Sequence, residues 1–155
     1  MRQVPNVLNF WSSKWCSSNL IHAVFLRLGT GKSYVIKVLL NILESLQLKS
    51  KIALTAPTGV AACNIRGMTI HAWSGIGLGK DPTEQLVGIV SRSRDAKKRW
   101  LETDILVIDE ISMLPAELFD KISQVGSRIR NNPAPFGGLQ VILCGDFYQL
   151  PPVGL

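Results

Sequence analysis

The sequence predicts an α/β domain in which a mostly parallel sheet is flanked by helices. Short apolar runs alternate with segments of helical periodicity, a pattern typical of parallel strands joined by helices. Polar and glycine-containing motifs follow these runs, and parallel α/β sheets bind their ligands beyond the carboxyl ends of the strands. The 155 residues, 46% of them apolar and 18% charged, suffice for one domain with a core of its own.

The expected elements follow one another along the chain with turns between them. Strands are expected at residues 23–25, 51–55, 104–108 and 139–144. Helices are expected at residues 33–48, 60–63 and 82–90, with a helical turn at 69–73. A further helix is expected after Pro115, with the apolar stripe Leu118, Ile122, Val125 and Ile129, and the Asn- and Pro-rich residues 131–135 end it.

The segment Gly29–Ser33 (GTGKS) reads as the second half of a phosphate-binding loop, between the first strand and the first helix. Glycines let backbone N–H groups approach phosphates, a lysine at Lys32 places a charge on them, and the Ser33 hydroxyl suits Mg²⁺. The first glycine of the full pattern is missing, because Leu26 stands in its place. A turn that resembles the motif by chance is the alternative interpretation.

Two further polar motifs follow predicted strands. Asp109 and Glu110 come directly after the apolar run at 104–108, where one carboxylate can hold Mg²⁺ and the other can orient or deprotonate a water. Helix capping is the alternative role for this pair. Asp146 and Gln149 follow the last strand, and an amide such as Gln149 can sense a γ-phosphate without carrying charge.

The composition bears on whether the chain binds an acidic partner, and it argues against a disulfide framework or a zinc site. The formal net charge of +6 and the pI of about 9.5 favour an acidic partner such as nucleic acid, although a solvated basic face is the simpler interpretation. The same two interpretations apply to residues 91–100, which carry five basic residues and one acid. The three cysteines lie far apart, so we expect neither a disulfide framework nor a zinc site. No apolar run approaches a membrane span.

Residues 1–28 differ in composition from the rest of the chain. They hold two of the four tryptophans and no acidic residue. A basic, acid-poor start is found in organelle presequences. We favour a spurious start, in which a wrong exon or reading frame joins a genuine domain near Gly29. We therefore expect an atypical segment at 1–28 and a single domain at 29–155.

Five motifs, taken together and in this order, resemble the amino-terminal motor domain of the petite-integration-frequency (Pif-type) DNA helicases, superfamily-one enzymes related to RecD. The motifs are GTGKS (29–33), TAPTGVAA (55–62), TIHAWSGIG (69–77), VIDEISML (107–114) and FGGLQVILCGDFYQLPPV (136–153). The resemblance covers nearly everything except the atypical start. It implies a RecA-like P-loop NTPase fold and an ATP-driven helicase that moves 5′ to 3′ on single-stranded DNA.

The resemblance also implies roles for particular residues, cofactors and partners. ATP and Mg²⁺ would be the cofactors, with Gly29, Thr30, Gly31, Lys32 and Ser33 on the nucleotide and Ser33 and Asp109 on the metal. Lys32, Glu110 and Gln149 would be catalytic. Thr58, Gly59 and His71 would contact DNA. Single-stranded DNA and duplex junctions are the implied partners, in DNA repair, recombination and telomere maintenance. The implied compartment is the nucleus, with the mitochondrion as the alternative.

Some features depart from the family pattern and leave alternatives open. The adenine-reading glutamine is not identifiable, and we expect the chain to end before the second RecA-like domain, which supplies an arginine finger. A non-catalytic remnant that binds DNA or a partner is therefore the second hypothesis, and a small-molecule kinase the third. For His71 the alternative is a packed histidine that caps a turn, and Trp73 is expected in the core rather than stacked on a base.

Overall fold

The computed structural model describes residues 21–25, 38 and 51–145 of the chain. These residues form a five-stranded sheet in the order β1-β5-β4-β2-β3, with every pairing parallel. The strands are β1 (Ile21–Phe25), β2 (Ile52–Ala56), β3 (Met68–Thr69), β4 (Ile105–Ile108) and β5 (Gln140–Gly145). This confirms the parallel sheet and its four expected strands, and β3 is an addition that the sequence did not predict.

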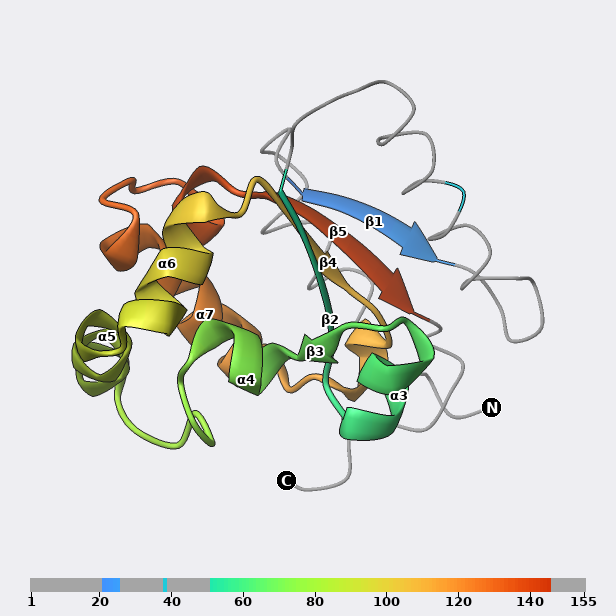
Figure 1. Ribbon diagram of the computed structural model, residues 1–155, viewed down its shortest axis with the longest axis horizontal. Coiled ribbons are helices and arrows are strands. Elements are labelled where there is room, and N and C mark those ends of the chain that lie inside the picture. Colours follow the sequence, from blue (N-terminus) through green and yellow to red (C-terminus); the bar gives the residue numbers. More distant parts are fainter. Residues whose placement is uncertain (1–20, 26–37, 39–50, 146–155) are drawn as a thin grey trace, which may run out of the picture.

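Helices lie where they were expected at 60–63, 69–73, 82–90 and after Pro115, and a further helix is added over the basic run at 91–100. They are α3 (Gly59–Asn64), α4 (Ile70–Ser74), α5 (Thr83–Arg92), α6 (Arg94–Glu102) and α7 (Ala116–Ile129), with short 3₁₀ turns η1 (Ile111–Met113) and η2 (Pro135–Gly138). Figure 1 shows α4 to α7 gathered on one side of the sheet and α3 beside the ends of the strands. Apart from residue 38, the helix expected at 33–48 lies outside the described residues, as do residues 1–20 and 26–28 of the atypical segment predicted at 1–28.

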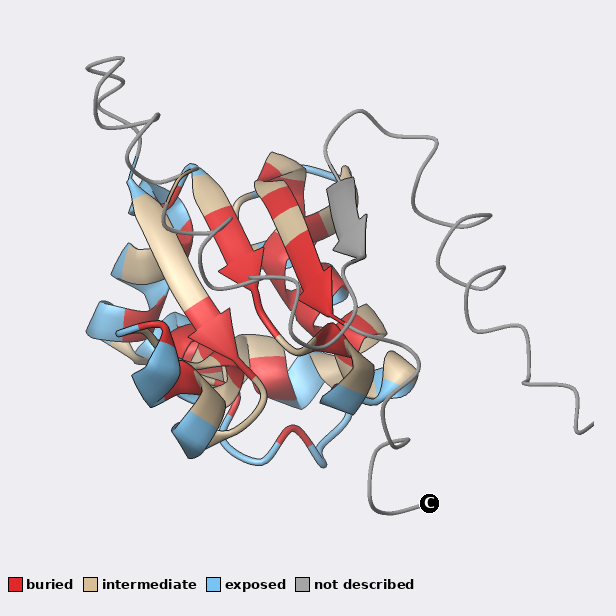
Figure 2. Ribbon diagram, turned by 90° about the vertical axis from the view of Figure 1, so that its right-hand side faces the viewer, coloured by how far each residue is buried: buried red, intermediate tan, exposed pale blue. Residues whose placement is uncertain are grey.

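The core has two parts, one on each face of the sheet. The larger part joins alternate residues of β4 and β5 to the apolar faces of α4 to α7, around Trp73, Trp100 and Phe119. The smaller part contains Val107 and Cys144 with the apolar residues of α3. In Figure 2 the buried colour runs along β4 and β5, as expected for parallel strands covered on both faces.

Close packing on the helical side depends on a glycine in α7. A β-carbon at Gly126 would stand 2.6 Å from the ring of Trp100 and 2.9 Å from the carbonyl carbon of Phe136. The two tryptophans Trp73 and Trp100 pack with their ring centroids 4.5 Å apart and their planes tilted by 55°, and both are buried. The expectation that Trp73 belongs to the core is therefore confirmed. Among the residues described, no helix has the length and apolar character needed to cross a membrane.

Candidate functional site

The carboxyl ends of the central strands meet at one edge of the sheet, the carboxyl edge. Thr55 pairs with Ile108, and Ile108 pairs with Leu143, so β2, β4 and β5 end nearly level. All the arrows in Figure 2 point to this edge. The expected strand-end residues that the structure describes, Asp109 and Glu110 among them, therefore lie on the side where α/β sheets bind ligands.

Asp109 is held in place at the end of β4 by its neighbours. Its backbone N–H donates to the carbonyl oxygen of Thr55 over 2.8 Å, and its Oδ1 accepts from the backbone N–H of Glu110 over 2.9 Å. The Thr55 hydroxyl donates to the carbonyl oxygen of Val107 over 2.8 Å. The side chain of Asp109 is buried, with 5% of the residue's surface exposed. A carboxylate fixed in this way is positioned in advance of any ligand.

Glu110 turns the chain sharply after β4. Its φ of 51° lies in the left-handed region, which is unfavourable for a residue with a side chain by about 1–2 kcal/mol. Strained backbone of this kind clusters at functional sites, where it re-aims a side chain. The turn leads into η1, and Glu110 is half-buried. The sequence carries no sign of this conformation, because glutamate has no preference for it.

Gly145 brings the end of β5 against this turn. A β-carbon at Gly145 would stand 2.8 Å from Cγ2 of Ile111, closer than real β-carbons approach, and 3.2 Å from the backbone nitrogen of Ile111, which is also a tight contact. Gly145, which lies within the motif at 136–153, therefore allows the backbone of β5 to approach Ile111 closely. It places the last residue of β5 beside the Asp109–Glu110 turn.

Thr58 and Gly59 form the turn after β2. The Thr58 hydroxyl accepts from the backbone N–H of Ala61 over 3.3 Å, so this side chain caps α3. Gly59 is exposed, and a β-carbon there would meet nothing within 4 Å. Gly59 thus has an open approach from solvent, whereas Thr58 has a structural role that the motif alone did not indicate.

His71 lies in the first turn of α4, the helix that begins after β3. Because β2 and β3 pair in parallel at Thr55–Met68 and Ala56–Thr69, α3 and α4 both begin at the carboxyl edge. The His71 side chain is half-buried, and burial lowers its pKa from the usual 6.5. The imidazole is therefore neutral at pH 7 and interacts through hydrogen bonds rather than charge.

Arg99 and Trp100, which no sequence motif singled out, hold α4 from the side. The Arg99 guanidinium donates from Nε to the carbonyl oxygen of Trp73 and from Nη2 to that of Ala72, each over 2.8 Å. Trp100 Nε1 donates to the carbonyl oxygen of Ser74 over 2.9 Å. These donors satisfy the carbonyls at the end of α4. Arg99 is thus an exception to the solvated face expected for residues 91–100.

Several predicted site residues lie outside the described residues. They are Gly29, Thr30, Gly31, Lys32, Ser33 and Gln149, together with Leu26 and Asp146. Their assignments stay predictions. The structure brings together the others, Asp109, Glu110, Thr58, Gly59 and His71, on elements that begin or end at the carboxyl edge.

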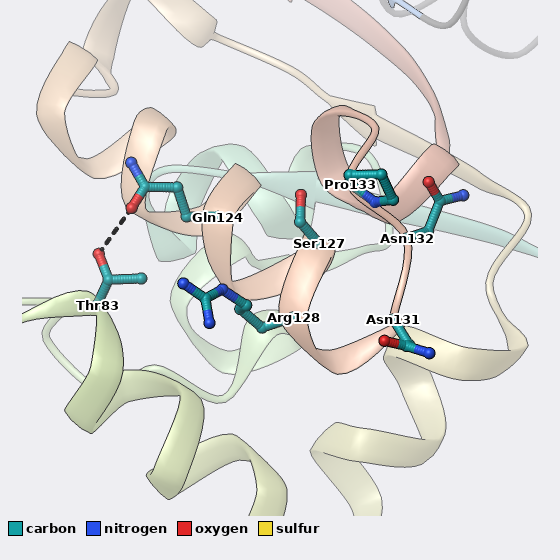
Figure 3. A pocket seen from close by; sticks show the side chains of 7 residues that line it. All are labelled: Thr83, Gln124, Ser127, Arg128, Asn131, Asn132 and Pro133. Atoms are coloured by element: carbon teal, nitrogen blue, oxygen red, sulfur yellow. Dashed lines mark hydrogen bonds between the residues drawn. The ribbon is translucent and has the colours of Figure 1, made fainter.

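A cleft of about 560 Å³ lies elsewhere, between α5, α7 and the chain that follows α7 (Figure 3). Its lining is polar, and the Thr83 hydroxyl donates to Oε1 of Gln124 over 3.2 Å across it. The residues that line it are Thr83, Gln124, Ser127, Arg128, Asn131, Asn132 and Pro133. None of them belongs to the predicted site, so this cleft is separate from the carboxyl edge.

A parallel sheet with an acidic pair at the carboxyl end of a central strand is the arrangement of RecA-like P-loop NTPase domains. The family model described as PIF1-like helicase matches residues 17–154, and the chain belongs to that family. The match begins within the segment set apart at residues 1–28. The boundary at residue 29 stays a prediction.

Individual relatives agree with this assignment. The chain is 50% identical over 127 residues to the ATP-dependent DNA helicase PIF1 of Emericella nidulans, covering 81% of this chain and 17% of that protein. It is 52% identical over 125 residues to the human ATP-dependent DNA helicase PIF1, covering 81% of this chain and 19% of that protein. The chain therefore spans less than a fifth of the length of these relatives.

Solved structures of relatives share the fold. The crystal structure of Pif1 helicase from Candida albicans superposes with a TM-score of 0.79 at 39% identity, over 99% of this chain and 35% of that one. Pif1 helicase from Bacteroides, crystallised with ADP-AlF3 and single-stranded DNA, gives a TM-score of 0.67 at 29% identity, over 100% of this chain and 34% of that one. These likenesses confirm the expected RecA-like fold.

Proposed function

We propose that this chain is the nucleotide-binding part of an ATP-dependent DNA helicase that moves 5′ to 3′ on single-stranded DNA. The observation that carries the proposal is the turn at Asp109 and Glu110, held at the carboxyl end of β4 in a chain of the PIF1-like helicase family. The relatives of Emericella nidulans and human are named ATP-dependent DNA helicases, and Pif1 helicase from Bacteroides was crystallised with ADP-AlF3 and single-stranded DNA.

The turn after β4 suits Mg²⁺. Asp109 offers a buried carboxylate on a fixed backbone, and Ser112, two residues after Glu110, has a buried hydroxyl oxygen with no hydrogen-bond partner in the described part of the chain. Mg²⁺ takes hard oxygen ligands and keeps several waters, so one carboxylate and one hydroxyl from the protein are enough. Asp109 and Ser33, the two residues that the resemblance assigns to the metal, would hold the ion. The Ser112 hydroxyl is a further oxygen in the same turn as Asp109. When bound, Mg²⁺ neutralises charge on the β- and γ-phosphates.

The remaining residues divide between the nucleotide and DNA. Gly29, Thr30, Gly31 and Lys32 would bind the phosphates, Gln149 would respond to the γ-phosphate, and Glu110 would orient the attacking water and accept its proton. Thr58, Gly59 and His71 would contact the DNA strand through backbone, hydroxyl and neutral imidazole groups. Such contacts read no base sequence, as translocation along any strand requires.

On family membership alone, we extend the proposal to duplex junctions as substrates. The same reasoning extends it to roles in DNA repair, recombination and telomere maintenance, in the nucleus or the mitochondrion.

ATP hydrolysis stimulated by single-stranded DNA tests the proposal. We expect Lys32→Ala to abolish both nucleotide binding and hydrolysis. Glu110→Gln should bind the nucleotide normally but hydrolyse it about 100-fold more slowly or worse, because the amide cannot accept the proton. Unchanged turnover in Glu110→Gln would refute the role given to this residue.

The replacement of the first loop glycine by Leu26 favours a second candidate, a remnant that binds DNA or a partner without turning over ATP. DNA binding with no hydrolysis in the unmodified chain, and none restored by Leu26→Gly, would support that candidate. Restored nucleotide binding in Leu26→Gly would instead show that the loop alone was impaired.

A further inference from the structure

The joint between α5 and α6 carries a dense group of exposed cations. Arg92 ends α5, and Arg94, Lys97 and Lys98 lie on α6, all four with exposed side chains. In the described part of the chain none of the four makes an ion pair or a side-chain hydrogen bond. Two other exposed cations are paired, Lys51 with Glu102 at 2.7 Å and Arg128 with Glu84 at 3.4 Å.

The cations of α6 share one side of the helix. Arg94, Lys97 and Lys98 are spaced i, i+3 and i+4, so their side chains project from adjacent positions on the same face. The opposite face packs inward through Ala96 and Trp100, which are both fully buried. We call Arg92, Arg94, Lys97 and Lys98 the basic face.

The acids nearby offset only part of the charge of the basic face. Glu102 is paired first with Lys51, whose hydrogen bond and charge lower the pKa of that carboxyl from 4.5, and the charge of Lys98 contributes less to the same lowering. Asp95 lies in the first turn of α6, where a carboxylate complements the positive end of the helix. The four cations therefore outnumber these two acids, one of which is shared with Lys51, and the face attracts anions.

The composition of the face favours a phosphate backbone over other polyanions. Its single exposed apolar side chain in the described residues is Leu101, 52% exposed, which is little apolar area for docking a protein. It exposes no aromatic side chain for base stacking, the usual anchor of single strands, because Trp100 is buried. The remaining feature is charge, and duplex DNA carries about one negative charge per 1.7 Å of its axis.

The basic face also lies apart from the proposed track of the single strand. Figure 1 shows α5 and α6 at one flank of the domain, whereas α3 and the strand ends lie toward the other side. Helix α4 lies between the two regions (Figure 1). The carbonyl oxygens at its end accept hydrogen bonds from the side chains of Arg99 and Trp100 in α6. A nucleic acid on the basic face is therefore a second contact, separate from Thr58, Gly59 and His71.

We propose that the basic face, Arg92, Arg94, Lys97 and Lys98, binds the phosphate backbone of duplex DNA without reading its sequence. The inference rests on the proposed function to the extent that DNA is the substrate. It adds a duplex contact on a surface remote from the carboxyl edge.

The test compares two variants of the full chain with equal net charge. In one, Arg92, Arg94, Lys97 and Lys98 are all replaced by glutamine. In the matched control, the exposed cations Lys51, Arg66, Lys80 and Arg128 are replaced by glutamine instead. Binding of a fluorescent 20-base-pair duplex is measured by anisotropy over a series of salt concentrations, and thermal melting confirms that both variants fold.

We expect the slope of log K against log salt to flatten by up to about 3.6 in the basic-face variant, since each of four lost phosphate contacts removes about 0.9. The control should flatten by less than about 1 on the same scale. Equal losses in the two variants would overturn the proposal, because only net charge would then matter. Duplex binding retained by the basic-face variant, with loss of binding to polyglutamate, would overturn it in favour of an acidic protein partner.

Hydrolysis separates this inference from the proposed function. The basic-face variant should keep nucleotide binding and hydrolysis stimulated by single-stranded DNA, because its residues lie at the joint of α5 and α6, away from the described strand ends. An unmodified chain that binds duplex through this face but binds no nucleotide would refute the proposed function and leave the inference standing.

Discussion

Two aspartates flank the same strand in opposite surroundings. Asp104 precedes β4, is exposed, and accepts from the backbone N–H of Lys51 over 2.8 Å. Asp109 follows β4, is buried, and is fixed by the backbone of Thr55 and Glu110. At the amino ends of the strands, which we call the amino edge, Asp104 makes a polar contact that is exposed to solvent. At the carboxyl edge the same residue type is held inside, next to a strained turn, as a ligand site requires.

The largest effect is expected where the carboxyl edge is packed most tightly. Gly145→Ala would place a β-carbon 2.8 Å from Cγ2 of Ile111, and we expect it to lower the free energy of unfolding by about 1–3 kcal/mol. The control is Gly88→Ala in α5, where a β-carbon meets nothing within 4 Å and the helix gains up to about 1 kcal/mol. Chemical denaturation of both variants measures the difference, and similar changes would contradict the packing account.

A second effect tests how α6 supports the helix that carries His71. Arg99→Ala removes two hydrogen bonds to the end of α4, and we expect a loss of about 1–2 kcal/mol in the free energy of unfolding. Arg94→Ala, on the exposed face of the same helix, should change it by less than about 0.5 kcal/mol. Thermal melting distinguishes them, and an equal loss would mean that Arg99 does not hold α4.

A smaller effect is expected from the burial of His71. Its pKa in the folded protein lies below the unfolded value of 6.5, so the unfolded chain binds the proton first as the pH falls. Stability should therefore be unaffected above about pH 7 and fall below about pH 6.5. His71→Gln should remove this part of the acid destabilisation, as measured by melting at pH 7.5 and 5.5. Identical pH dependence in the two proteins would contradict a buried, neutral histidine.

The smallest effect is expected at the amino edge. Lys51→Met removes the contact with Glu102, whose folded pKa is lowered by the Lys51 hydrogen bond. Any stability from this contact exists above the unfolded pKa of Glu102 and is lost as the pH falls through the lower folded value. Both side chains are exposed, so we expect a change near the detection limit of melting at neutral pH and none in high salt. A large loss of stability in Lys51→Met would mean that side-chain contacts at the amino edge are as important to the fold as those at the carboxyl edge.

Much of the fold could be predicted from the sequence because its strands are short apolar runs. The run at 104–108 is apolar at every position after Asp104, which fits a strand buried on both faces. The two-residue strand β3 could not be predicted, because Met68 and Thr69 form a strand only through their pairing with Thr55 and Ala56. Pairing between distant segments leaves no periodicity to read.

The residue types of the candidate site stand out in the sequence, but its geometry does not. Asp109 and Glu110 stand out in the sequence because they follow an apolar run. The positive φ of Glu110 and the close approach at Gly145 depend on neighbours from β2 and β5. Arg99 was placed in a solvated run because its partners, the carbonyls of Ala72 and Trp73, are backbone groups that any sequence could supply.

The central claim is that Asp109, and not Asp104, belongs to the nucleotide site. Mg²⁺-dependent binding of a fluorescent ATP analogue to the Asp109→Asn and Asp104→Asn variants tests it most directly, with Lys32→Ala as the control for specific binding. We expect Asp109→Asn to need about 10-fold more Mg²⁺ or worse, whereas Asp104→Asn should bind like the unmodified chain. The same Mg²⁺ dependence in both aspartate variants would contradict it.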